Sequence, residues 1–136
     1  MFLIDSSAWI EYLRPKGSKS VKARVREILE KENAVSCGIV VVEILTGAKD
    51  DRSFQMLKDT LQSLPQIPMD NTVIERAAKY GFMLDRKGKT VSTTDLFIAA
   101  AAKDKAVILH VDSDFETIGS IVGLRHEKID LEHTLN

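Results

Sequence analysis

The sequence is poor in several residue types that mark particular classes of protein. In 136 residues it has one cysteine, three prolines and 6% aromatic residues, too few for a disulfide framework or a proline-rich linker. Cys37 lies in an apolar stretch, where a small buried thiol is the expected role. An excess of one charge is also missing, because 19 basic residues are balanced by 20 acidic ones. A protein that holds nucleic acid through a basic surface alone is therefore not expected.

Long hydrophobic runs are missing as well. A membrane span needs about 20 continuous apolar residues, and the run that begins at Leu96 ends at Lys103. The amino terminus has no basic segment ahead of a long apolar one, so we do not expect a signal peptide. With an unpaired cysteine, these features predict a soluble cytoplasmic protein without membrane contact. Length and composition suit one globular domain, and we expect a single domain over residues 1–136.

Short apolar runs separated by amphipathic segments indicate the fold class. The runs are typical of strands buried on both faces, at residues 2–4, 34–37, 67–69 and 106–111. Helical crossovers between them favour parallel pairing, which predicts a three-layer α/β/α sandwich with a short, mostly parallel central sheet. Residues 39–45 are ambiguous, since their β-branched side chains favour a strand. Glu43 within them favours a helix from about Gly38, stopped by Gly47.

Acidic residues occupy positions where an ionised side chain is costly. Asp5 follows the first predicted strand, Asp112 and Asp114 follow the last, and Asp95 lies in the first turn of an Ala-rich helix. The apolar neighbours of Glu43 predict a buried carboxylate without a basic partner. Taken singly, each aspartate could be an ordinary cap or turn residue. Because the carboxyl ends of parallel strands share one edge, the group is better explained as oxygen ligands for Mg²⁺ or Mn²⁺.

Other chemistries have little support in the sequence. No Gly-x-Ser-x-Gly turn marks a nucleophilic serine, and the three histidines stand late in the chain, unpaired by spacing. His110 is expected to border the cation site, and His126 and His133 to lie at the surface. Neither a Walker loop nor a Gly-x-Gly-x-x-Gly turn follows the first strand, and clusters of zinc ligands are missing.

Four short segments resemble, in order and spacing, the acidic signatures of PIN-domain ribonucleases. They lie at residues 2–10, 43–47, 94–100 and 111–115. Among these enzymes the chain is most similar to the short VapC-type toxins, and the similarity covers nearly its whole length. It implies that the four family acids, which are catalytic and metal-binding, fall on Asp5, Glu43, Asp95, and either Asp112 or Asp114.

The resemblance also implies an activity and partners. The family hydrolyses single-stranded or looped RNA with Mg²⁺ or Mn²⁺, and its toxins are held inactive by a cognate antitoxin and commonly form homodimers. Ser7 matches a hydroxyl position beside the first acid, where it would order water or phosphate. Basic residues that flank the acids are candidate phosphate contacts: Arg86, Lys87 and Lys89 before Asp95, and Arg14, Lys16, Lys19, Lys22 and Arg24 after the first predicted helix.

Three other functions are alternatives to the toxin. A PIN-like domain could instead process RNA outside a toxin pair. A metal-dependent phosphatase acting on small molecules also uses acids at strand ends, but Asp5 lacks the second acid two residues on that such enzymes use. A binding module that has lost turnover is disfavoured because acids stand at all four positions.

The antitoxin of a toxin pair would meet the acidic site with a cation. We expect a C-terminal segment that directs Arg or Lys at Asp5, Glu43 and Asp95, while its apolar residues cover a groove near the first two predicted helices. On that helix Trp9 suits core and surface equally, whereas Ile10 and Leu13 are expected in the core.

Overall fold

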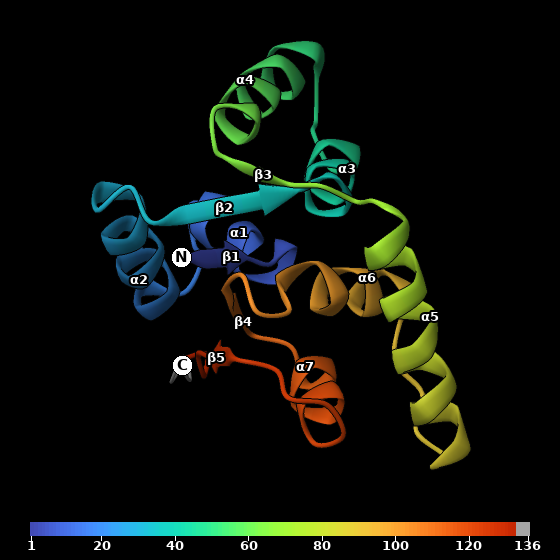
Figure 1. Ribbon diagram of the computed structural model, residues 1–136. Helices are drawn as coiled ribbons and strands as arrows, with labels where there is room; N and C mark the ends of the chain where they lie inside the picture. Colours follow the sequence, from blue (N-terminus) through green and yellow to red (C-terminus); the bar gives the residue numbers. More distant parts are fainter. Residues whose placement is uncertain (133–136) are drawn as a thin grey trace.

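Five short parallel strands form the centre of the protein (Figure 1). The structure is a computed structural model that describes residues 1–132, so His133 lies outside the described part. The strand order is β3-β2-β1-β4-β5, and each neighbouring pair is parallel. The strands are β1 (Phe2–Ile4), β2 (Ala34–Cys37), β3 (Gln66–Ile67), β4 (Val107–His110) and β5 (His126–Lys128).

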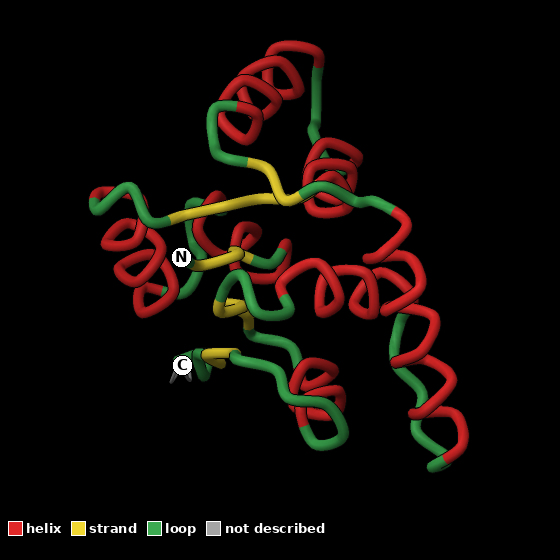
Figure 2. Tube along the Cα trace, in the orientation of Figure 1, coloured by secondary structure: helices red, strands yellow, loops and turns green. Residues whose placement is uncertain are grey.

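Helices connect the strands and cover the sheet, which confirms the predicted α/β class (Figure 2). The segment that was ambiguous in the sequence is helical, and Gly47 lies at its carboxyl end as expected. Within the described residues, no helix combines the length and apolar content needed to cross a membrane. The helices are α1 (Ser6–Leu13), α2 (Lys19–Glu30), α3 (Gly38–Thr46), α4 (Asp51–Gln62), α5 (Asn71–Arg86), α6 (Thr93–Ala102) and α7 (Ser113–Gly119).

Two elements, α7 and β5, are absent from the sequence prediction. The residues after β4 have the composition of a loop, but the Asp112 carboxylate accepts a hydrogen bond from the Asp114 amide at 2.9 Å and caps α7. Strand β5 is a polar edge strand without apolar alternation. His126, expected at the surface, is half-buried on this strand.

The core lies around the two central strands. Leu3 and Ile4 of β1 and Ile108 and Leu109 of β4 are fully buried, as is Cys37, which confirms the expected role of that thiol. Helix α6 buries Ile98 and the alanines at 99–102, and these small residues let the helix lie close to its neighbours.

The sheet has its switch point between β1 and β4. From β1 the chain adds β2 and β3 on one side, whereas β4 and β5 stand on the other. At such a point the carboxyl ends of the two strands open a crevice that ligands use. Asp5 follows β1 there, and its backbone amide bonds to the Leu109 carbonyl of β4 at 2.9 Å.

Candidate active site

Asp5 is buried at the start of α1 and holds a carboxylate oxygen without a partner. Its Oδ2 accepts hydrogen bonds from the Ser7 amide at 3.0 Å and the Ser7 hydroxyl at 2.5 Å. Its Oδ1 has no hydrogen-bond partner within the described residues. Burial raises the pKa of Asp5 to about 6, and the charges of Glu43 and Asp112 add to that shift. An orphaned, buried oxygen of this kind suits a cation ligand.

Asp95 lies in the first turn of α6 and is 7% exposed. Ser92 caps the helix, since its hydroxyl accepts a bond from the Asp95 amide at 3.1 Å. The pKa of Asp95 is raised well above its usual range, first by burial and then by the negative charges of Asp5 and Asp112. The Ser92 cap therefore fixes the backbone of Asp95, while the Asp95 carboxylate lies near the carboxylates of Asp5 and Asp112.

Asp112 and Asp114 both lie beside Asp95. One carboxylate oxygen from each of the three residues is within 4.8 Å of the others, a spacing that suits ligands lying about 2.0–2.6 Å from one ion. Asp112 also caps α7, and Asp114 Oδ2 accepts a weak bond from the Ser92 amide at 3.3 Å. The sequence left the fourth acid open between these two, and the fold brings both to the same place.

Glu43 lies near Asp5, outside the group of three, and is exposed, so the prediction of a buried carboxylate is wrong. Helix α3 buries only Val40 and Ile44, and it turns Val42, which is 63% exposed, and Glu43 outward. The Ser6 hydroxyl donates to Glu43 Oε1 at 2.8 Å and holds the side chain near Asp5. Sequence reasoning missed Ser6, although its place beside Ser7 after the first acid was a usable signal.

Ser7 ties the first acid to the end of β4. Its hydroxyl donates to Asp5 and accepts a bond from the Val111 amide at 3.2 Å. Both contacts are internal, so the hydroxyl fixes the rotamer of Asp5 and the position of the β4 end. The expected contact of Ser7 with water or phosphate stays a prediction.

The basic residues fall into two groups with different surroundings. Near α2, Arg14 pairs with Glu11 at 2.6 Å and Arg24 with Glu127 at 2.7 Å, while Lys22 donates to the Tyr12 carbonyl at 3.1 Å. These contacts occupy the charges of those three residues, whereas Lys16 and Lys19 of the same predicted group form no ion pair within residues 1–132. At the end of α5, Arg86 and Lys87 form no ion pair within residues 1–132.

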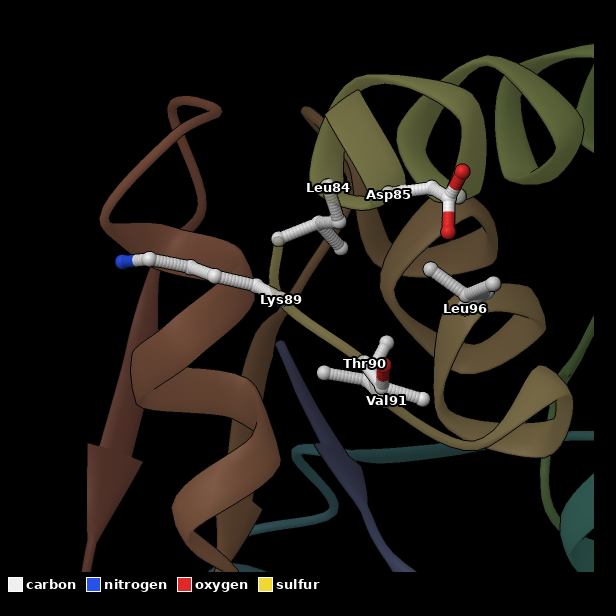
Figure 3. Close-up of a pocket in the computed structure, with 7 residues that line it drawn as sticks. Leu84, Asp85, Lys89, Thr90, Val91 and Leu96 are labelled. Atoms are coloured by element: carbon white, nitrogen blue, oxygen red, sulfur yellow. The ribbon is translucent and has the colours of Figure 1, made fainter. Parts of the chain in front are cut away.

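A small cavity of about 150 Å³ lies between the end of α5 and the start of α6 (Figure 3). Leu96, next to Asp95 in the chain, is in its wall, and Lys89 points away from the other labelled residues. The Lys89 ammonium reaches the Ser120 hydroxyl at 3.4 Å. The cavity therefore adjoins the acids without containing them. Its lining comprises Gly81, Leu84, Asp85, Lys89, Thr90, Val91 and Leu96.

An open parallel sheet with carboxylates gathered at its switch point defines an α/β protein whose acidic cluster could hold a divalent cation. Residues 2–120 match the PIN domain family model. Ribonuclease VapC11 of Mycobacterium tuberculosis is 39% identical over 130 residues, which cover 92% of this chain and 96% of that protein. The chain belongs to the PIN-domain family, in its VapC ribonuclease group.

Solved structures share the same fold. FitAB bound to an IR36 DNA fragment aligns with a TM-score of 0.79 and 21% identity, covering 98% of this chain and 99% of that one. VapBC2 from Rickettsia felis, bound to a promoter DNA fragment, aligns with a TM-score of 0.75 and 19% identity, covering 95% and 98%. The predicted resemblance to PIN-domain ribonucleases is thus confirmed, and the architecture extends over nearly the whole chain.

Replacing Asp5 with asparagine should stabilise the metal-free protein at neutral pH. The raised pKa of about 6 means that ionised Asp5 costs the folded state about 3 kcal/mol relative to the unfolded chain. An amide removes that cost but leaves its own NH₂ group unpartnered, so we expect a gain of about 1–2 kcal/mol.

The pH dependence of this gain has a definite sign. The folded state holds the Asp5 proton more tightly than the unfolded state, so ionisation of Asp5 destabilises the protein as the pH rises from about 4 to about 6. Urea unfolding in EDTA should show almost no gain for Asp5→Asn at about pH 3.5 and the full gain at about pH 7.5. Asp85→Asn, at an exposed carboxylate, should change little at either pH. An equal gain for Asp5→Asn at both pH values would contradict the assignment.

Proposed function

We propose that this protein is a Mg²⁺- or Mn²⁺-dependent endoribonuclease and the toxin of a toxin-antitoxin pair. The observation that carries the proposal is the group of three carboxylates within 4.8 Å beside the orphaned Asp5 oxygen. Membership of the VapC group supports the ribonuclease activity. We further propose that residues 1–136 act as a single nuclease domain in the cytoplasm.

The acids have distinct parts in this proposal. Asp5, Asp95, Asp112 and Asp114 hold the cation, and Ser7 keeps one Asp5 oxygen engaged so that the other is directed to the site. A bound divalent cation lowers the pKa of a water molecule and offsets charge on the phosphodiester. Glu43, oriented by Ser6 at the open side, completes the acidic cluster where a substrate would enter.

The substrate grip comes from basic residues outside the acids. Arg86 stacks over the Phe82 ring, 4.3 Å from its centroid, and with Lys87 it marks the end of α5 ahead of the loop that leads to Asp95. Cations with no carboxylate partner are suited to phosphate oxygens. Without a cation the acidic site would repel RNA, so these contacts hold the strand while the metal neutralises the centre.

Cleavage of RNA should depend strictly on a divalent cation. We expect a labelled single-stranded or hairpin RNA to be cut internally with Mg²⁺ or Mn²⁺, and cutting to stop in EDTA and return when the cation is restored. p-Nitrophenyl phosphate added in parallel tests the small-molecule phosphatase. Hydrolysis of that ester without RNA cleavage, or undiminished RNA cleavage in EDTA, would overturn the proposed function.

A protein partner is the second part of the proposal. The structural neighbours include a toxin-antitoxin complex from Klebsiella pneumoniae, which supports a cognate antitoxin here. On α1 the expected burial of Ile10 and Leu13 is wrong, because they are 47% and 42% exposed. Trp9, which suited core and surface equally, is buried at 1% exposed. Ile10 and Leu13 thus offer the apolar surface expected for the antitoxin. We also propose a homodimer, which sedimentation would test.

A further inference from the structure

A buried histidine stands at the end of β4, just before the turn that carries two of the acids. His110 is fully buried, and its ring lies 4.8 Å from that of Phe115 on α7 and 5.1 Å from that of His126 on β5, centroid to centroid. The mechanism above gives this polar ring no role. A buried imidazole needs hydrogen-bond partners, and the partners it has connect it to the site.

The hydrogen bonds of His110 fix its tautomer. The Asp112 amide donates to His110 Nδ1 at 3.1 Å, so this nitrogen carries no proton. The other nitrogen, Nε2, lies 2.9 Å from His126 Nδ1 and must donate to it. Burial, with the neighbouring His126, lowers the pKa of His110 to about 4, in agreement with a neutral ring. The chain of donors therefore runs from the Asp112 amide through His110 to His126.

His126, at the outer end of this chain, lies next to the carboxyl end of α7. A Cβ atom on Gly119, the last residue of α7, would lie 3.2 Å from His126 Nε2, closer than an ordinary contact. The glycine therefore leaves room for the His126 ring against the helix end. Helix α7 begins with Asp112 as its cap and ends next to His126, so the two histidines lie at the start and the end of the same short helix.

We propose that His110, supported by His126, is a positioning residue for the cation site. By accepting a hydrogen bond from the Asp112 amide, it fixes the backbone from which the Asp112 carboxylate projects. Asp112 in turn caps α7, the helix that carries Asp114. The inference rests on the proposed function, because it assumes that these carboxylates hold a cation. Outer contacts that orient metal ligands commonly change metal affinity by about 10–100-fold when they are removed.

Two variants of nearly equal shape separate this role from packing. In His110→Asn the amide oxygen takes the place of Nδ1 and can still accept the Asp112 proton, whereas His110→Leu has the same branched shape and no acceptor. We expect the Kd for Mn²⁺, measured by calorimetry, to rise about 10–100-fold in His110→Leu. His110→Asn should stay within about threefold of the original protein. Ile118→Val, which thins the same core on α7 without touching the hydrogen bonds, should leave the Kd unchanged.

The outcomes are distinct. Equal Mn²⁺ affinity in His110→Leu and His110→Asn would overturn the positioning role, even if both variants melt at lower temperature. Should His110→Leu fail to fold, the ¹H–¹⁵N imidazole spectrum of the unaltered protein decides, because a proton found on His110 Nδ1 would also overturn it. Absence of Mn²⁺ binding by the unaltered protein would instead contradict the proposed function, so the two failures can be told apart.

Discussion

Asp95→Asn should reduce RNA cleavage by about 1000-fold or more while the fold is retained. The substitution keeps the shape of the side chain and removes one of three carboxylates that lie within 4.8 Å of each other. Losing the stabilisation that a metal ion gives to the transition state costs several kcal/mol. A loss of about 4 kcal/mol corresponds to a 1000-fold lower rate. Initial rates at saturating Mn²⁺, with circular dichroism as the check on folding, measure the effect.

The matched control for this prediction is Asp85→Asn. It makes the same chemical change on the same side of the molecule, at an exposed residue of α5 that lines the neighbouring cavity. We expect its cleavage rate to stay within about twofold of the original. If Asp95→Asn retained a tenth of the activity or more, Asp95 would not be a ligand of the catalytic cation, and the site model would need another centre.

The positions of the aspartates could be predicted because they depend on local pattern. Asp5 and Asp112 directly follow apolar runs that become β1 and β4, and parallel strands end at one edge of a sheet whatever their order. Asp95 lies in the first turn of a helix whose start is marked in the sequence by Thr93 and Thr94, although the cap itself is Ser92. These signals need no knowledge of which surfaces the helices bury.

The exposure of individual side chains could not be predicted in the same way. Helix α3 is apolar nearly all round, yet only part of it meets the core, so Glu43 and Val42 face outward. The same limit explains α1, where Trp9 is buried and Ile10 is not. Which stripe of an apolar helix is covered depends on neighbouring elements, and periodicity alone does not choose between two apolar stripes.

The histidine pair was missed for a related reason. His126 belongs to β5, whose three polar residues carry no strand pattern, so nothing in the sequence placed it next to His110. The pairing exists because β5 adds to the edge of β4, where Leu109 aligns with Glu127 and His110 with Lys128. That a residue of a polar edge strand contacts the site can be recognised only once the sheet register is known.

The surface expected to meet the antitoxin leads directly to the acids. Ser6, Ile10 and Leu13 are spaced four and three residues apart and so lie along one face of α1. At the Ser6 end of this face, the bond to Glu43 at 2.8 Å joins α1 to α3. A partner segment lying on the exposed Ile10 and Leu13 side chains would reach the acidic cluster, where an Arg could bridge two carboxylates.

Ile10→Asp combined with Leu13→Asp should therefore release the enzyme from its antitoxin. Two apolar contacts at the centre of an interface are worth about 2 kcal/mol each, so binding of the product of the adjacent small gene should weaken by roughly 1000-fold. Co-expression would then no longer relieve growth arrest, while RNA cleavage by the isolated protein would be unchanged. The matched control is Ile74→Asp on α5, because Ile74 is 47% exposed, as Ile10 is, and lies on a different helix. If inhibition survives the double change, or is lost equally with Ile74→Asp, the antitoxin does not bind along α1 as proposed.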